Sequence, residues 1–473
     1  MFRLNSFITM GGRKMSRNII LNDKGYISTH SDDAPNIIGY IPGKNDSEYI
    51  FLGAHYDGFF HSYQDDALGV GIILAIAKAI IDSGQRPEYT IGLIMHGAEE
   101  FGASDSHYDW CTGSWNQTTN MENSDWLDKI KLFANIDAVN PDKKDCLVQA
   151  SPELHDFFED LFTMRQYESG KWYEKYNVED VGGPWSDDYS YFMKGIPIVI
   201  CGRGKSQWRS NHYHTQFDNS EMLDVDFCQN ISELYMLILS SFDESSVKSF
   251  KYEKILDMYL NSLRRDVLEK CDINVSKLLD KINSCREKIL SVMKKVENKN
   301  YNGINTEYVN VLEHVNTMMI EKLRGLNLDD EIIFSQEDLQ ENYEYFSSLE
   351  YALNAGKEQK ASQIMSMLFG YSIISKFSEE VYKHWCLDVF CPQKKKLFWG
   401  DKRINAPVDI MNLYRQFTSE QSNGNCYKNT LNELSKLKKE NCSSINEKIN
   451  EHYELFITIE AKLKSILEGS KCE

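Results

Sequence analysis

The sequence predicts an α/β domain with a mainly parallel, mixed sheet flanked by helices, followed by an all-α C-terminal domain. The first half alternates short apolar runs with longer helix-like runs, which is typical of strands separated by helices. In the second half glycine becomes sparse and apolar residues recur three and four positions apart. Because 473 residues exceed one ordinary core, we expect two domains, residues 1–243 and residues 244–473.

Short runs rich in Ile, Leu and Val predict the strands of the first domain. They cover residues 49–54, 90–97, 131–137 and 196–202, and each runs into glycine or polar residues. The run "GVGIILAIAKAIIDSG" between the first two predicts a helix that ends at Gly84, with Pro87 beyond it as a stop signal. This order of elements indicates a parallel sheet, in which ligands collect at the carboxyl ends of the strands.

Amphipathic helices account for the second domain. The runs that predict them cover residues 252–270, 275–298, 308–326 and 429–467. No strict heptad persists in the last run, so we expect it to fold as a packed helical hairpin rather than as a dimeric coiled coil. Such a domain can bind a partner protein or mediate oligomerisation.

Composition restricts the partners and the compartment of the protein. The net charge of -19 argues against a nucleic-acid partner, since phosphate binding needs clustered Lys and Arg. No apolar run reaches the roughly 20 residues of a membrane span. The N-terminus lacks a signal-peptide pattern, and the eleven cysteines follow no framework spacing. We therefore expect a cytoplasmic protein with reduced thiols.

Histidines and carboxylates follow the predicted strands and gather at one end of the sheet. Five segments deliver them: His55 and Asp57; Asp65 and Asp66; Glu99 and Glu100; Asp137; and His212, His214 and Asp218. Any single one could be an ordinary loop residue, but several converging carboxylates would repel one another without a cation. Carboxylate and imidazole ligands together suit zinc, and a carboxylate that bridges suits a pair of zinc ions.

The order of these motifs resembles a known family. "HYD", "DDALG", "GAEEFG", "NIDAVN" and "HTQFD" follow one another as in the co-catalytic di-zinc aminopeptidases, a group that includes glutamate carboxypeptidase, glutaminyl cyclases and the transferrin receptor. The resemblance covers residues 36–219, under half of the chain, and implies a zinc-exopeptidase fold. Family members usually carry more chain ahead of this region, so the N-terminal part is expected to be short or truncated.

The resemblance implies a site with two zinc ions. His55, Asp137 and Asp65 would bind one ion, and His214, Glu100 and Asp65 the other, so that Asp65 is the bridge. Cobalt or manganese can occupy the same ligands. Asp66 and His61 are not expected among the ligands.

Further roles follow from the same resemblance. Asp57 would orient His55, and Asp218 would do the same for His214, because a metal-bound imidazole usually donates its other N–H to a carboxylate. Glu99 would be the general base. Tyr213 would stabilise the oxyanion, with a simple aromatic lining of the cleft as the alternative. The family commonly has S-D-H where this chain has S-D-D at residues 186–188.

The function implied is a zinc-dependent aminopeptidase that hydrolyses the N-terminal residues of peptides, with Glu99 as general base. The alternatives are a carboxypeptidase or deacylase of the same architecture, then a cyclising acyltransferase, and a non-catalytic binding protein on this scaffold. Two other features remain open. Arg203 and Arg209 could bind a substrate carboxylate or form salt bridges, and the cluster of His384, Cys386 and Cys391 favours a buried helix over a second zinc site.

Overall fold

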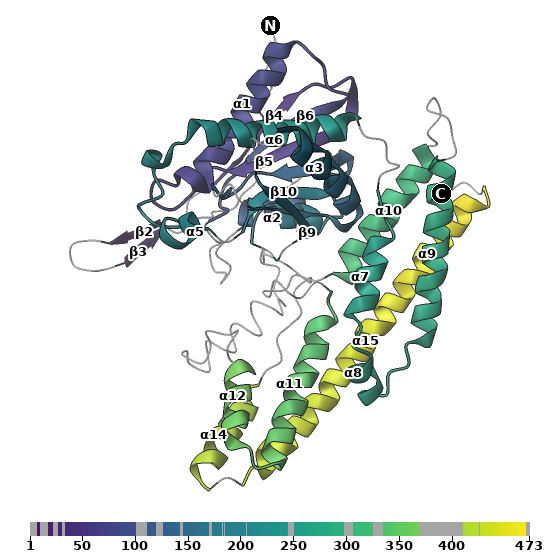
Figure 1. Ribbon diagram of the computed structural model, residues 1–473. Coiled ribbons are helices and arrows are strands. Elements are labelled where there is room, and N and C mark those ends of the chain that lie inside the picture. The colour runs from purple at the N-terminus through teal and green to yellow at the C-terminus, as the bar shows by residue number, and fades with distance from the viewer. Residues whose placement is uncertain are drawn as a thin grey trace. The chain divides into compact units, whose positions relative to one another are not determined.

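The computed structural model divides the chain into two compact units, residues 1–254 and residues 255–473 (Figure 1). The structure describes residues 7–9, 18–21, 27–30, 34–100, 111–119, 126–141, 145–169, 173–181, 183, 185–204, 206–244, 250–297, 306–324, 334–368, 410–424 and 426–469. Among these residues, no helix combines the length and the apolar character that crossing a membrane requires.

An eight-stranded mixed sheet forms the centre of the first unit, with strand order β1-β4-β6-β5-β7-β10-β8-β9. The strands are β1 (Phe7–Thr9), β4 (Asn36–Ile41), β5 (Asn45–His55), β6 (Tyr89–His96), β7 (Ile130–Asn135), β8 (Asp145–Ala150), β9 (Lys175–Asp180) and β10 (Ile198–Arg203). A separate hairpin pairs β2 (Asn18–Leu21) with β3 (Ile27–His30). The four central strands β6, β5, β7 and β10 run parallel, which confirms the predicted sheet.

Burial on both faces explains the continuous apolar runs of these strands. Ile50, Phe51 and Leu52 of β5 are fully buried, because helices cover both sides of the sheet. The predicted helix is α1 (Leu68–Ser83), and it ends where Gly84 adopts a φ of 66°. A residue without a Cβ takes this left-handed conformation at little cost, and its N–H bonds to the carbonyl of Ile81.

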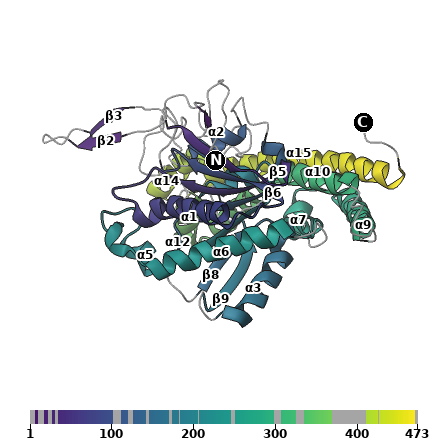
Figure 2. The ribbon, with the colours of Figure 1, turned by 90° about the horizontal axis from the view of Figure 1, so that it is seen from above.

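Two pairs of helices cover the sheet. Helix α1 packs against β5 and against α6 (Val225–Glu244), whereas α4 (Asp188–Phe192) packs against β7, β10 and α2 (Thr112–Thr119). Figure 2 shows α1 and α6 on one face of the sheet and α2 on the other. The other α-helices in the described part of the unit are α3 (His155–Ser169), which packs on β9, and the short α5 (Gln207–Asn211).

The second unit is helical, as the sequence predicts. Its described helices are α7 (Lys254–Ser262), α8 (Arg265–Lys270), α9 (Ser276–Glu297), α10 (Thr306–Leu323), α11 (Glu337–Asn354), α12 (Glu358–Leu368), α14 (Met411–Ser422) and α15 (Lys428–Leu467). The expected hairpin over 429–467 is wrong, because α15 is one continuous helix of 40 residues. It packs against α9, α10, α11 and α14, and these neighbours bury its apolar stripe without a turn.

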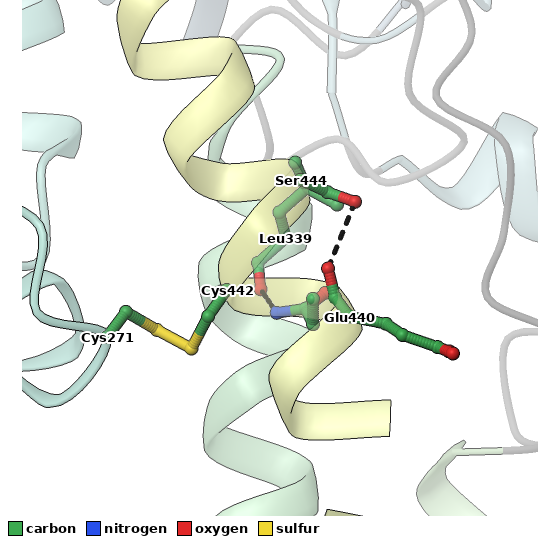
Figure 3. The surroundings of a disulfide bond; sticks show 6 residues. Cys271, Leu339, Glu440, Cys442 and Ser444 are labelled. Carbon is green, nitrogen blue, oxygen red and sulfur yellow. Dashed lines mark hydrogen bonds between the residues drawn. A yellow bond between two sulfur atoms is a disulfide. The ribbon is translucent and has the colours of Figure 1, made fainter. Parts of the chain in front are cut away.

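A disulfide bond joins Cys271, just after α8, to Cys442 in the middle of α15 (Figure 3). The expectation of reduced thiols is therefore wrong for this pair. The two cysteines lie 171 positions apart, so the spacing along the chain carried no signal of their pairing. Among the described residues the other six cysteines are free.

His452 of α15 lies in a buried polar network of the helical unit. Its side chain is almost fully buried, and it bonds through Nδ1 to the Tyr259 hydroxyl at 2.7 Å and through Nε2 to Ser335 Oγ at 3.3 Å. Burial lowers the pKa of His452 to about 3, which keeps the imidazole neutral.

Candidate metal centre

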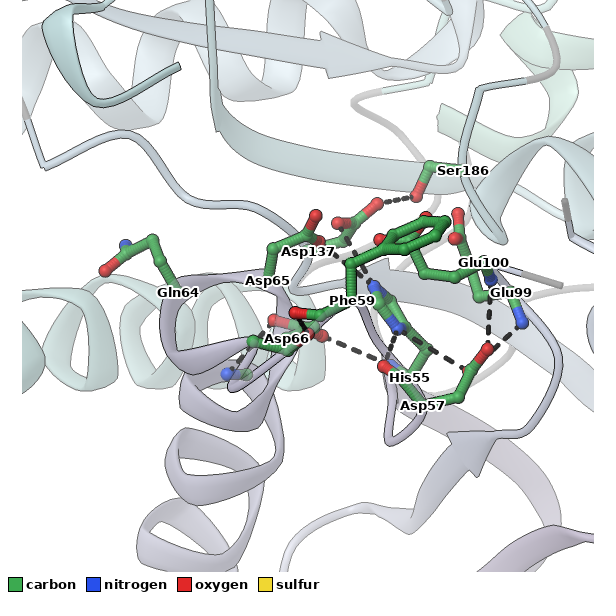
Figure 4. A network of polar contacts seen from close by, with 12 residues as sticks. His55, Asp57, Phe59, Gln64, Asp65, Asp66, Glu99, Glu100, Asp137 and Ser186 are labelled. Atoms are coloured by element: carbon green, nitrogen blue, oxygen red, sulfur yellow. Dashed lines mark hydrogen bonds and ion pairs between the residues drawn. The ribbon is translucent and has the colours of Figure 1, made fainter. Parts of the chain in front are cut away.

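The residues predicted as metal ligands converge at the carboxyl ends of the parallel strands (Figure 4). His55 is the last residue of β5, Glu100 follows β6, and Asp137 follows β7. Asp65 lies in the helical turn Tyr63–Ala67 that precedes α1, and its peptide bond to Asp66 is cis. His214 lies in the loop that follows α5.

Asp65 lies between the two imidazoles with one carboxylate oxygen toward each. Its Oδ1 is 3.2 Å from His55 Nε2, and its Oδ2 is 3.2 Å from His214 Nε2. Asp137 Oδ1 completes the first side at 3.6 Å from His55 Nε2, and Glu100 Oε1 completes the second at 2.8 Å from His214 Nε2. This is the arrangement that a bridging carboxylate requires.

The donor set fits divalent cations. Two groups of side chains, His55 with Glu99 and Asp137 and His55 with Asp65 and Glu100, each place ligand atoms within 4.8 Å of one another. Two buried atoms, Asp65 Oδ2 and His214 Nε2, lie 3.2 Å apart, and neither has a hydrogen-bond partner among the described residues. Atoms buried in this way are costly unless an ion binds them.

The electrostatics of the centre reflect crowded carboxylates. Burial raises the pKa of Glu100 to about 7, even though the nearby imidazole of His214 acts to lower it. Burial acts to lower the pKa of His214, but the nearby carboxylates of Asp65 and Glu100 outweigh this effect and raise that pKa to about 9. The centre therefore attracts positive charge, as a metal site should.

Asp57 contacts His55 Nδ1 through both its main chain and its carboxylate, and the main-chain contact is the shorter one. His55 Nδ1 lies 2.9 Å from the backbone carbonyl of Asp57 and 3.7 Å from its carboxylate. That carboxylate also accepts hydrogen bonds from the backbone N–H of Glu99 at 3.1 Å and of Glu100 at 3.0 Å. Asp57 thus holds both glutamates in place, and its main chain orients His55.

Asp218 does not contact His214 either. Its carboxylate accepts hydrogen bonds from the backbone N–H of Gln64 at 2.9 Å and of Asp65 at 3.2 Å. The predicted orienting role is therefore wrong, because Asp218 fixes the turn that carries the bridging aspartate. Within the described residues, no hydrogen bond reaches Nδ1 of His214.

Asp66 has a structural role next to the bridge. It is buried and accepts hydrogen bonds from the backbone N–H of His55 at 3.2 Å and of Gly69 at 3.1 Å. A Cβ at position 69 would lie 2.4 Å from the Asp66 carboxylate, so only glycine fits there. This contact gives the glycine of the D-D-x-x-G motif a physical reason.

Glu99 is buried beside His55 and Asp137, 5% exposed. Burial and the nearby carboxylates of Glu100 and Asp137 raise its pKa well above the usual range, against the opposing effect of His55. Cys111, a residue that the sequence analysis did not single out, points its thiol at Glu99 Oε1 at 3.4 Å. Nothing in its sequence context signals this contact, since eleven residues separate Cys111 from Glu99 along the chain.

The segment S-D-D at residues 186–188 contributes polar contacts around Asp137. Ser186 Oγ donates a hydrogen bond to Asp137 Oδ2, and Asn135 Nδ2 donates to Ser186 Oγ at 2.8 Å and to Asp188 Oδ1 at 3.2 Å. Asp188, which stands where the family has histidine, is therefore an acceptor for Asn135. Asp187 is buried, and burial raises its pKa well above the usual range.

Tyr213 stacks on the next residue of the chain, His214, with ring centroids 3.7 Å apart. The guanidinium carbon of Arg209 lies 4.7 Å from the centroid of the Tyr213 ring. Among the described residues Arg209 forms no ion pair with an acid, so its contact with Tyr213 stands in place of the salt bridge that was one of the two alternatives for it. His384, Cys386 and Cys391 lie outside the described residues, as does the side chain of Arg203.

Residues 36–239 match the sequence profile of Peptidase family M28. This region of the chain is therefore similar to that family, and it is called the M28 region below. The match confirms the resemblance that the ordered motifs suggested, and the five converging side chains all lie within the M28 region.

Two curated proteins that are similar to this chain come from Caenorhabditis species. A protein of Caenorhabditis briggsae named "Glutamate carboxypeptidase 2 homolog" is 31% identical over 98 residues, which is 19% of this chain and 13% of the relative. Its counterpart in Caenorhabditis elegans, with the same name, is 22% identical over 249 residues, which is 45% of this chain and 31% of the relative. The chain thus spans less than a third of the length of these relatives.

A solved structure, the LapA aminopeptidase of Legionella pneumophila, is similar with a TM-score of 0.36 at 19% identity. The similarity covers 45% of this chain and 56% of LapA.

Proposed function

We propose that the M28 region is a zinc-dependent exopeptidase that removes N-terminal residues from peptides. The observation that carries the proposal is the convergence of two imidazoles and the carboxylates of Asp65, Glu100 and Asp137 on one centre at the end of the sheet. Mixed imidazole and carboxylate ligands suit zinc, and the position of Asp65 between the histidines suits two ions.

Bound zinc would polarise the scissile carbonyl and make a water molecule more acidic. The residues of the chain supply the proton transfers and the positioning. Glu99, held by the carboxylate of Asp57 through its backbone N–H, takes the proton of the attacking water and returns it to the leaving amine. Burial raises the pKa of Tyr213 well above its usual range, so its hydroxyl stays protonated and can donate to the oxyanion.

A carboxypeptidase is the second candidate. It is favoured by the name of the two nematode relatives, "Glutamate carboxypeptidase 2 homolog". The two candidates differ in which free terminus of the peptide the site must recognise, and both use the same centre.

The test combines zinc analysis with two sets of substrates, aminoacyl nitroanilides with a free amine and N-acetylated dipeptides with a free carboxylate. We expect bound zinc and turnover of the first set, with a loss of about 10²–10⁴-fold in kcat for Glu99→Gln. Glu88→Gln is the matched control, because Glu88 lies on the surface of the same unit and pairs with Lys44.

Three results would contradict the proposal in different ways. Zinc-loaded protein that turns over only the acetylated dipeptides would favour the carboxypeptidase. Zinc-loaded protein without turnover of either set would refute the exopeptidase activity. Equal activity of Glu99→Gln and Glu88→Gln would refute the role of Glu99 as the base.

A further inference from the structure

His214 is the more exposed of the two histidines of the metal centre. Its side chain is 35% exposed, whereas that of His55 is 1% exposed. His55 Nδ1 bonds to the carbonyl of Asp57, but in the described part of the chain Nδ1 of His214 has no partner. A metal-bound imidazole normally needs such a partner to fix the orientation of its ring. The described contacts of the His214 ring are instead with neighbouring aromatic side chains.

Two aromatic rings contact the imidazole of His214. The Phe59 ring lies with its centroid 4.6 Å from that of His214, tilted by 44°. The Tyr213 ring contacts the same imidazole with centroids 3.7 Å apart and an angle of 21° between the planes. The guanidinium of Arg209 then stacks on Tyr213. His214 thus lies within a row of planar groups, and Figure 4 shows Phe59 close to the carboxylates of the centre.

Phe59 lies in a turn that is held by hydrogen bonds between Phe59 and Ser62. The carbonyl of Phe59 accepts hydrogen bonds from the backbone N–H of Ser62 at 3.1 Å and from its hydroxyl at 2.6 Å. A Cβ at position 58 would lie 2.0 Å from Ser62 Oγ, so glycine is required for this turn. The turn connects His55 to the bridging Asp65, which means that its short length sets where the Phe59 ring lies.

We propose that Phe59 is a positioning residue that holds His214 by contact between the two tilted rings in place of a hydrogen bond, and so determines the affinity of the ion bound by His214, Glu100 and Asp65. This inference rests on the proposed two-ion site. The ion on the side of His55 does not depend on Phe59, because its histidine is buried and bonded to the main chain of Asp57.

The test measures zinc stoichiometry and affinity of the full-length protein by titration against chelator buffers, alongside kcat. For Phe59→Ala we expect one ion to be retained and the other to bind about 10- to 100-fold more weakly, the usual cost of losing a residue that orients a ligand. Phe59→Tyr keeps the ring and should bind both ions as the wild type does. Phe59→Leu keeps apolar volume without a ring and should behave like Phe59→Ala.

Phe60→Ala is the matched control. Phe60 is the adjacent residue of the same loop and is 71% exposed, so its removal should change neither ion. Unfolding midpoints of the zinc-free variants show whether each protein is folded, and if Phe59→Ala is not, the comparison of Phe59→Leu with Phe59→Tyr decides.

Separate results would overturn the two proposals. A wild type that binds two ions, together with a Phe59→Ala or Phe59→Leu variant that binds both with unchanged affinity, would overturn the role of Phe59 alone. A folded wild type that binds no zinc would overturn the proposed function and this inference with it.

Discussion

Removal of the disulfide should strongly destabilise the helical unit. Cys271 and Cys442 are separated by 171 positions, so the bond closes a long loop that would otherwise be free in the unfolded chain. The loop-closure relation gives about 5 kcal/mol for a loop of this size, and losing a native disulfide typically costs about 2 to 5 kcal/mol. For a denaturant slope of about 2 kcal/mol/M in urea, the unfolding midpoint should fall by about 1 to 2.5 M.

The assay is urea unfolding of the full-length protein followed by far-UV circular dichroism, which reports mainly on helices. The perturbation is Cys271→Ser combined with Cys442→Ser, and the matched control is Cys426→Ser, because Cys426 is an exposed free cysteine of the same unit. Reductant should lower the midpoint of the wild type and of the control but not that of the double variant. A wild-type midpoint that does not respond to reductant would refute the reasoning.

Three further predictions concern single residues. The carboxylate of Asp57 accepts hydrogen bonds from two backbone N–H groups, and Asp57→Asn leaves only one oxygen to accept them. We expect kcat, measured by steady-state kinetics, to fall about tenfold or more, while circular dichroism shows little change in folding. Gly53→Ala would place a Cβ 2.2 Å from the Phe133 ring and should lower the free energy of unfolding, measured in the same urea titration, by about 1 to 3 kcal/mol. Gly71→Ala lies on a helix with open space around the new Cβ and should raise the free energy of unfolding by up to about 1 kcal/mol. The pKa of His452 is about 3 in the folded state against 6.5 for the free side chain, so between these two pH values the unfolded chain binds one proton more than the folded chain. As the pH drops from 6.5 to about 3, the free energy of unfolding should therefore fall by up to about 1.4 kcal/mol per pH unit. His452→Gln should reduce that slope, and an unchanged slope would contradict the assignment.

Local pattern predicted the central part of the first unit. The four central strands β5, β6, β7 and β10 and helix α1 were predictable because each is a continuous apolar run bounded by a breaker, and their order along the chain restricts these strands to parallel neighbours. Position at strand ends, together with the resemblance, also predicted which side chains gather at the metal centre. The hairpin expected within α15 failed because a broken heptad pattern does not reveal whether neighbouring helices cover a long helix on several sides.

The sequence by itself determined the fold class of the first unit and the helical character of the second, since these depend on periodicity and on order along the chain. The set of side chains that meet at the centre followed from the ordered motifs and the family that they resemble. Only the tertiary structure decided what supports that centre. Asp57 holds the two glutamates and Phe59 packs on His214, whereas the sequence suggested one carboxylate behind each histidine. The disulfide between Cys271 and Cys442 belongs with these contacts. These three contacts depend on which segments of the chain lie side by side in the folded core, and the spacing of residues along the chain does not predict which segments those are.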